Sequence, residues 1–376
     1  MPAPMPDARA QRTPWPLIAA LYVTGLLAGA QFSKVSLTLE GLAQVYPGWP
    51  VAFAVSGVAV MGIVFGVMAG GITASFGPRR AILWALAISG LAGGLGAFLP
   101  PFPVLMGLRI FEGAGHLILV VAVPTLMAGL AVARDRALVM GIWATFFGVG
   151  FSVTALLIGD AGPSRIYGVH AALMVVMVGL LARMLPKGVV TARRALPRLS
   201  DHLLIYSTPR LFAPGLGHGI YAGLFLALIT FVPAALGAPW LAAVLPIVSI
   251  AGSLSVGVLA RWIAPGTLVW TMFLLLAALF GWTALAGAFA PYILIAAMVV
   301  SGVVAGAGFA AVPWLHKADE DRALSNGALA QLGNVGTFSG TPIFAALAAG
   351  AYLPAAVGVC LVAALVTGLA YRAARA

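Results

Sequence analysis

Long apolar stretches, most of them about twenty residues in length and joined by short polar connections, fill most of the 376-residue chain. An α-helix needs about 20 apolar residues to cross the hydrocarbon of a bilayer, whereas a barrel strand needs about 10. The pattern therefore predicts an all-α integral membrane protein. We assign twelve spans, at 15–38, 50–74, 80–99, 103–127, 138–159, 166–185, 208–235, 238–262, 267–288, 291–314, 325–347 and 352–371.

A repeat divides these spans into two sets of six. Residues 135–150 read DRALVMGIWATFFGVG and residues 321–336 read DRALSNGALAQLGNVG, with eight identities in sixteen positions at an offset of 186. The longest polar stretch, 186–207, lies between the two sets. Two homologous halves in the same orientation explain this arrangement. We expect a tail at 1–14, six-helix bundles at 15–185 and 208–371, a linker at 186–207, and a tail at 372–376.

Composition supports a membrane protein and excludes a soluble domain. Hydrophobic residues make up 62% of the chain, charged residues 8%, and the mean hydropathy is +1.09. Nine acidic residues cannot provide the charged surface of a soluble protein of this size. The net charge of +11 is therefore interpreted as an orientation signal and a contact with lipid headgroups, and no nucleic-acid partner is expected. The single cysteine, Cys360, forms neither an intrachain disulfide nor a metal motif.

The positions of the basic residues predict the orientation. If both termini are cytoplasmic, seventeen of the twenty lysines and arginines fall in inner segments, Arg165 lies outside, and Lys34 and Arg109 lie within spans. Such a bias is typical of cytoplasmic loops. We therefore expect both termini in the cytoplasm. Frequent alanine and glycine with short loops favour a bacterial inner membrane.

Two local motifs accompany this architecture. Residues 70–80 read GGITASFGPRR between the second and third spans, and residues 109–115 read RIFEGAG in the fourth. Together with the half-repeat, they resemble the major facilitator superfamily over nearly the whole chain. Three positions depart from the family pattern: Ala74 replaces its usual acidic residue, Glu112 replaces glutamine, and the fifth span lacks the Gly-Pro of proton-antiporting drug exporters. The missing proline favours symport or uniport over drug/proton antiport.

The resemblance implies a secondary transporter that works by alternating access, with a central cavity lined by helices one, four, seven and ten. It also implies a cytoplasmic gate built from the loop motif and from the repeated charged loops. The residues of the repeated charged loops could form ion pairs in one access state that break in the other. The alternative is that these loops are simply charged and solvated. The gate candidates are Gly70, Gly77, Arg79, Arg80, Arg134, Asp135, Arg136, Asp321 and Arg322.

Ionisable residues inside the spans are the strongest site candidates, because a charge in hydrocarbon is costly unless it is paired or hydrated. Arg109, Glu112 and His116 fall within about 60° of one another on the fourth helix. Arg109 would attract an anion or hold Glu112, while Glu112 and His116 would exchange a proton. The alternative is a structural Arg–Glu pair between helices four and one. Lys34 could reach the headgroups, pair with Glu40 or Glu112, or bind an anion.

The second half offers four polar candidates. His218 and Tyr221 lie three residues apart in the seventh span, and Gln331 and Asn334 lie three apart in the eleventh. All four could hydrogen-bond a substrate. The alternative for His218 and Tyr221 is helix packing. The alternative for Gln331 and Asn334 is interhelical hydrogen bonding.

Motifs of other protein classes are missing from the sequence. It has no His-Glu-x-x-His, no paired aspartates within spans and no phosphate loop, and its five histidines are scattered. We expect no enzyme activity, no cofactor and no metal. The prediction is a monomeric secondary transporter of a small solute coupled to protons. Lys34 and Arg109 outnumber Glu112, which favours an anion; the alternative is a proton-coupled exporter of drug-like or neutral amphipathic compounds.

Overall fold

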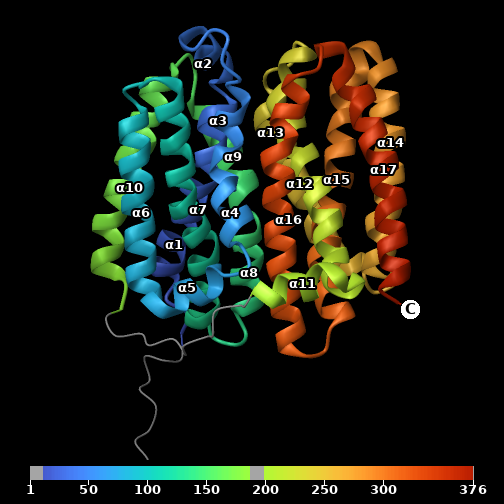
Figure 1. Ribbon diagram of the computed structural model, residues 1–376, viewed down its shortest axis with the longest axis horizontal. Coiled ribbons are helices and arrows are strands. Elements are labelled where there is room, and N and C mark those ends of the chain that lie inside the picture. Colours follow the sequence, from blue (N-terminus) through green and yellow to red (C-terminus); the bar gives the residue numbers. More distant parts are fainter. Residues whose placement is uncertain (1–11, 187–198, 376) are drawn as a thin grey trace, which may run out of the picture.

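The computed structural model describes residues 12–186 and 199–375, and in these ranges the chain forms helices and short 3-10 turns without strands. The ribbon forms two groups of helices side by side (Figure 1). The first group contains α1 (Trp15–Ser36), α2 (Leu39–Val45), α3 (Ala52–Ser56), η2 (Gly57–Ala59), α4 (Val60–Phe65), α5 (Ala69–Phe76), α6 (Pro78–Gly96), α7 (Phe102–Leu130), α8 (Arg136–Ala144), α9 (Phe146–Leu157) and α10 (Pro163–Met184).

The second group begins with a short helix and continues with six long ones. It contains α11 (Leu199–Ser207), α12 (Pro209–Ala235), α13 (Leu241–Leu259), α14 (Pro265–Leu285), η3 (Gly287–Phe289), α15 (Ala290–Leu315), α16 (Asp319–Ala345), η4 (Ala349–Ala351) and α17 (Tyr352–Ala373). Part of the predicted linker is thus the helix α11, on which Leu203 is 74% exposed. The tail through residue 11 and the linker residues 187–198 lie outside the described residues.

Eight of the described helices are long and apolar enough to cross a membrane, and a ninth is added if α8 and α9 count as one bent span. Helices coincide with all twelve predicted ranges, although the range 50–74 is divided among α3, η2, α4 and the start of α5. Glycines at 57, 62, 66, 70 and 71 explain the interruption, because glycine weakens a helix interior. The number of membrane crossings remains a prediction.

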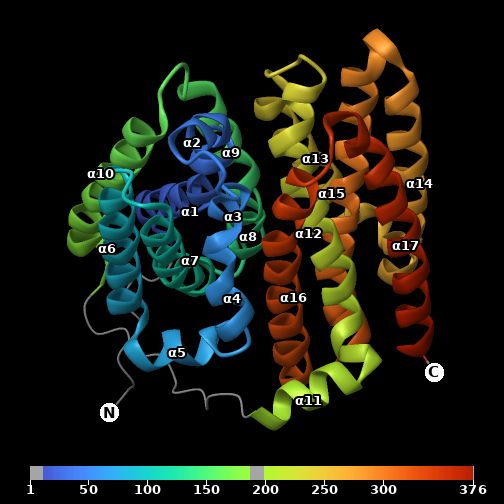
Figure 2. The ribbon, with the colours of Figure 1, turned by 45° about the horizontal axis from the view of Figure 1, so that its top comes forward.

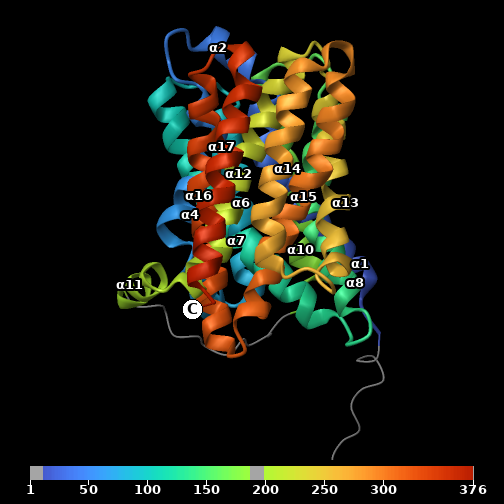
Figure 3. The ribbon, with the colours of Figure 1, turned by 90° about the vertical axis from the view of Figure 1, so that its right-hand side faces the viewer.

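Figures 1 and 3 show the two ends of the molecule, each with its own short helices. We call the end where α17 finishes and α5, α8 and α11 lie the termini end, and the end that carries α2 the far end. A connection of two residues, 37–38, joins α1 to α2 at the far end.

The two groups meet at two main contacts. Helix α9 packs on α13, and α16 packs on α3, η2 and α4 (Figure 2). At the first contact, a Cβ on Gly148 would lie 2.7 Å from the carbonyl oxygen of Pro246. At the second, a Cβ on Gly62 would lie 2.2 Å from the side chain of Asn334. Glycine thus lets the helices of the two groups approach closely at both contacts.

Inside the second group, glycines four residues apart bring α12 and α16 together. Gly219 and Gly223 face Gly336 and Gly340, and a Cβ on Gly336 would lie 1.8 Å from the carbonyl oxygen of Gly219. Small residues at this spacing form one face of a helix and allow backbone contact in lipid. These α12 glycines therefore serve close packing.

The fifth predicted span is bent by 45° between α8 and α9 without a proline. Thr145 lies at the break, where its hydroxyl donates to the carbonyl of Ile142 at 2.7 Å and accepts from the Tyr22 hydroxyl at 2.7 Å. A side chain that hydrogen-bonds inside the helix ladder in this way bends a helix.

Candidate functional site

Three charged side chains form a buried cluster within the first group. The Lys34 ammonium on α1 donates to Glu112 Oε1 on α7 at 2.6 Å, and Arg109 Nη1 donates to Glu112 Oε2. Lys34 and Arg109 are fully buried, and Glu112 is 1% exposed. Lys34 thus pairs with Glu112 and not with Glu40, the other carboxylate expected as a partner. We call Lys34, Arg109 and Glu112 the ionic cluster.

Backbone carbonyls hold the guanidinium of Arg109 in place. Nε donates to Ala54 O at 2.8 Å and Nη2 donates to Gln31 O at 2.8 Å, with Val55 O at 3.5 Å. These contacts join α7 to α1 and α3. Helix α7 can bring Arg109 this close because Gly57 lies beside it, where a Cβ would be 3.2 Å from the Cβ of Arg109.

Helix α10 adds two residues that sequence reasoning missed. His170 Nε2 donates to Leu27 O at 3.0 Å, so its Nδ1 is the acceptor for the Lys34 ammonium at 3.2 Å. The Tyr167 ring lies 4.7 Å from the same ammonium, a cation–π distance. Tyr167 and His170 are three apart in the predicted span 166–185, which is the same helical spacing that identified Arg109 and Glu112.

A hydrogen-bonded link leads from the cluster to His116. The Gln31 side chain accepts from His116 Nδ1 at 2.7 Å and donates to the Ser89 hydroxyl at 2.8 Å, while its backbone carbonyl accepts from Arg109. His116 is half-buried, whereas Gln31 is fully buried. Because Nδ1 is the donor here, a proton taken up by the imidazole would go to Nε2. His116 is thus the more accessible end of the network.

The ionic cluster carries a net charge of +1, because its two cations face one carboxylate. Its paired hydrogen bonds offset much of the desolvation penalty of the individual charges. One positive charge nevertheless stays uncompensated in a buried environment. An anion placed close to the cluster would compensate it.

Aromatic rings connect this region with the second group of helices. Neighbouring ring centroids along the series lie between 5.0 and 6.3 Å apart. In order, the rings are His116, Phe32, Phe147, Phe225, Tyr221, His218 and Phe309. The step from Phe147 to Phe225 crosses between the two groups. We call this series the aromatic path; it places the candidates His116, His218 and Tyr221 on one route.

His218 and Tyr221 are both half-buried on α12. His218 Nδ1 is buried without a hydrogen-bond partner among the described residues. Its ring packs against Phe309, and a Cβ on Gly333 would lie 2.9 Å from it. His218 therefore has a packing role, and the buried Nδ1 is a polar atom that this packing leaves unsatisfied.

Gln331 and Asn334 lie at the contact between the groups. Gln331 Nε2 donates to Ile63 O of α4 at 2.6 Å, and Gln331 Oε1 accepts from the Tyr206 hydroxyl of α11 at 2.6 Å. Asn334 Nδ2 donates to Ala330 O within α16. The amide of Gln331 is thus engaged in interhelical hydrogen bonds in this conformation.

The candidate gate residues of the loop motif lie at the termini end. Gly77 has a φ of +77°, which a residue with a side chain rarely adopts, and it separates α5 from α6. Arg79 Nη2 donates to Ala182 O at the end of α10 at 2.9 Å. Arg80 is exposed, and a Cβ at Gly70 would meet no atom within 4 Å.

The repeated charged loops occupy the starts of α8 and α16. In the first, Asp135 accepts from the Thr13 hydroxyl at 2.6 Å and lies 3.6 Å from Arg134, while Arg136 Nε donates to Ala128 O at 3.2 Å. In the second, Asp321 lies 4.0 Å from His316 Nδ1, and Arg322 Nε donates to His316 O at 3.0 Å. Each of these contacts joins residues of the same half. Their role in gating remains a prediction.

Two helical groups that meet along paired helices, with buried charges inside the first group, are the arrangement expected for a membrane transport protein. The family model of the Major Facilitator Superfamily matches residues 17–317. The chain belongs to this superfamily, and the resemblance inferred from the motifs is confirmed. It is accordingly a membrane transporter.

Solved structures of transporters share the fold over almost the whole chain. A bacterial homologue of the human lysosomal transporter Spinster, inward-facing and occupied, superposes with a TM-score of 0.74 at 14% identity, covering 96% of this chain and 97% of that one. Its unoccupied form gives 0.75 at 13% identity with the same coverage. The inward-open xylose transporter XylE from E. coli gives 0.72 at 14% identity, covering 94% and 95%. No curated protein sequence matches the chain.

Proposed function

We propose that this transporter moves a small anionic solute together with protons. The observation that carries the proposal is the ionic cluster with its net charge of +1, joined through Gln31 to the half-buried His116. Alternating access between two six-helix domains in a bacterial inner membrane, with cytoplasmic termini, belongs to the same proposal. The basic residues predicted on the termini side support that orientation.

Electrostatics explains how anion and proton would be coupled. The positive cluster lowers the energy of an anion bound near it, and it opposes a second positive charge on His116. An anion bound near His116 removes this opposition, so that each ligand favours binding of the other. Together they add no net charge, which favours their joint movement through a low-dielectric bundle.

Contacts at the far end support an alternating-access cycle. The Ser36 hydroxyl at the end of α1 lies 2.7 Å from the Thr230 hydroxyl of α12, and Thr341 Oγ1 lies 3.5 Å from Ala52 O. Both contacts join the two halves away from the termini end. They would have to separate for a solute to enter or leave at the far end.

Uptake into proteoliposomes tests the coupling. A panel of small organic and inorganic anions would be offered under an inside-alkaline gradient, with and without an ionophore that abolishes it. His116→Gln should lose gradient-driven accumulation but retain solute counterflow, because counterflow needs no proton movement. His202→Gln on α11 is the matched control and should accumulate solute normally. If the wild type accumulates solute equally with and without the pH gradient, proton coupling is excluded.

A second variant tests the anion. Arg109→Lys keeps the charge but loses the fork that holds Glu112 and the carbonyls of Ala54 and Gln31. Lower anion affinity in folded protein would support a contribution of Arg109 to anion binding. Unchanged affinity would leave Arg109 with a structural role only.

The aromatic path favours export of a neutral amphipathic compound as a second function. Aromatic rings bind flat apolar molecules without requiring charge. Lys34→Met separates the two functions, because it removes the net positive charge and leaves the aromatic path intact. Anion transport should fall several-fold in this variant, whereas proton-driven export of an amphipathic dye should be unchanged.

A further inference from the structure

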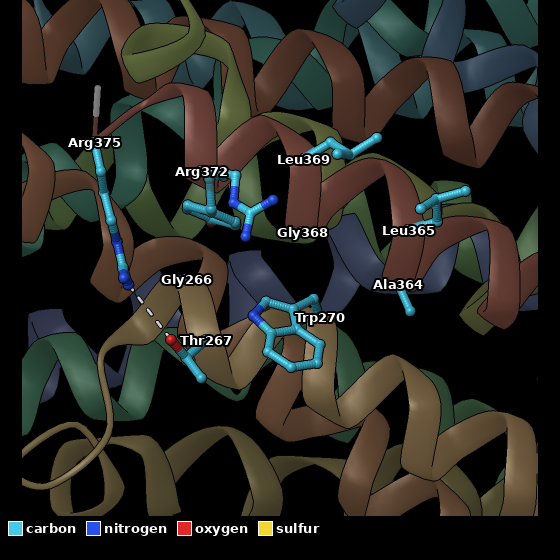
Figure 4. A pocket seen from close by; sticks show the side chains of 10 residues that line it. Gly266, Thr267, Trp270, Ala364, Leu365, Gly368, Leu369, Arg372 and Arg375 are labelled. Atoms are coloured by element: carbon cyan, nitrogen blue, oxygen red, sulfur yellow. Dashed lines mark hydrogen bonds between the residues drawn. The ribbon is translucent and has the colours of Figure 1, made fainter.

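A cavity of about 460 Å³ opens between α14 and α17. Figure 4 shows Trp270 and Thr267 on one wall and Arg372, Leu369 and Leu365 on the other. Both helices belong to the second group, at its outer side in Figure 1, so the cavity is separate from the ionic cluster and from the contact between the groups. Its size is within the range of small-ligand sites.

One end of the cavity is polar and positively charged. Arg372 and Arg375 line it, and none of its ten lining residues is acidic. Arg375 Nη2 lies 3.4 Å from Thr267 Oγ1, a long contact (Figure 4). The Arg375 guanidinium also lies 5.1 Å from the Trp314 ring centroid. Two exposed cations near a hydroxyl can bind a phosphate group.

An unsatisfied polar atom lies at the same cavity. Tyr371 lines it, is 2% exposed, and its hydroxyl is buried without a hydrogen-bond partner among the described residues. Buried hydroxyls without partners are uncommon in folded proteins.

The rest of the cavity wall is apolar. Leu365 and Leu369 are 63% and 56% exposed, one helical turn apart on α17. Gly368 has no side chain to fill the space opposite Trp270, and a Cβ there would lie 3.7 Å from that ring. The apolar part thus continues from the charged end along the helix axis, as an acyl chain does beneath its headgroup.

We propose that this cavity binds an anionic phospholipid, with its phosphate on Arg372 and Arg375 and an acyl chain along Leu365 and Leu369. Basic pockets between transmembrane helices are typical binding sites for anionic headgroups. A lipid explains the combination of charged and apolar walls, whereas free phosphate would use the charged end alone. The site is independent of the solute pathway.

Native mass spectrometry of the full chain in detergent tests the site. The probes are phosphatidylglycerol, phosphatidylcholine with the same acyl chains, and inorganic phosphate. Wild-type protein should retain phosphatidylglycerol in preference to phosphatidylcholine, and inorganic phosphate should not displace it. Arg372→Gln with Arg375→Gln should weaken phosphatidylglycerol binding about 25-fold, from two contacts worth roughly a factor of five each.

The matched control changes the same charge elsewhere. Arg183→Gln with Arg261→Gln removes two exposed arginines that do not line the cavity, and it should retain the lipid. Gly368→Leu keeps both arginines and fills the apolar part, so it should also lose the lipid. The proposal would be overturned if the two double variants retained phosphatidylglycerol equally or if the wild type retained both lipids equally. Displacement of phosphatidylglycerol by inorganic phosphate would also overturn it.

Discussion

Glu112 is the residue on which the ionic cluster depends, because its two oxygens serve both cations. Removing its charge would leave Lys34 and Arg109 facing each other with a net charge of +2. Removing the charge of Lys34 instead would leave a neutral Arg109–Glu112 pair. The two substitutions therefore change the net charge of the cluster in opposite directions.

Glu112→Gln should accordingly destabilise the protein strongly, by about 3–5 kcal/mol, as expected for an unpaired buried charge. Lys34→Met should lose only about 1–2 kcal/mol, from the hydrogen bonds to Glu112 and His170. Thermal unfolding in detergent measures the difference. Equal loss in the two variants would show that net charge does not govern the stability of the cluster.

Sequence patterns located part of this cluster. The spacing of Arg109, Glu112 and His116 placed them on one helical face, and Glu112 was among the partners considered for Lys34. His170 and Tyr167 were missed because their neighbours are set by the packing of α10 on α1, which local spacing does not encode. Gln31 lies three residues before Lys34 in the same predicted span, but its bridge to His116 and Ser89 depends on three helices at once.

At the scale of the element, the glycines of α12 and α16 decide how closely two helices approach. We expect Gly336→Ala to destabilise the protein by about 1–3 kcal/mol, because its Cβ would lie 1.8 Å from the Gly219 carbonyl oxygen. Gly358→Ala on α17 is the control, since a Cβ there meets nothing within 4 Å. It should be neutral or stabilise by up to about 1 kcal/mol.

Thermal unfolding of the two alanine variants provides the comparison. A Gly336→Ala protein as stable as Gly358→Ala would mean that α12 and α16 can separate without loss. The sequence shows that the seventh span is rich in glycine but does not show what these glycines face. Their packing role became clear only when the partner glycines of α16 were placed opposite them.

Helix boundaries followed the apolar pattern closely, because lipid requires continuous hydrogen-bonded helices. The exceptions are instructive. The second predicted span is interrupted at its glycines, and the fifth bends by 45° at Thr145 although it has no proline. The hydroxyl contacts of Thr145, including that of Tyr22 from another helix, depend on tertiary packing.

At the scale of the whole molecule, the hydrogen bond between Ser36 and Thr230 joins the two halves at the far end. In a Cys360→Ser background, we expect Ser36→Cys with Thr230→Cys to form a disulfide, since the two hydroxyl oxygens are 2.7 Å apart. The cross-link should stop transport, because the far end could no longer open. Electrophoretic mobility and uptake measured before and after reduction test this.

Each single-cysteine variant serves as a control and should transport solute with or without oxidant. Recovery of transport on reduction would separate cross-linking from damage to the fold. Full transport by completely cross-linked protein would contradict alternating access through the far end.

The sequence by itself determined the membrane class, the helical ranges, the half-repeat and the superfamily, because these depend on local hydropathy and on motifs a few residues long. It also identified the buried charges, since a charged side chain within an apolar span is costly in lipid and must be paired or hydrated. Only the tertiary structure decided which partners those charges have, which glycines face each other and where the cavity between α14 and α17 opens. Such features depend on side chains from helices far apart in the chain, and only packing sets the distances between them.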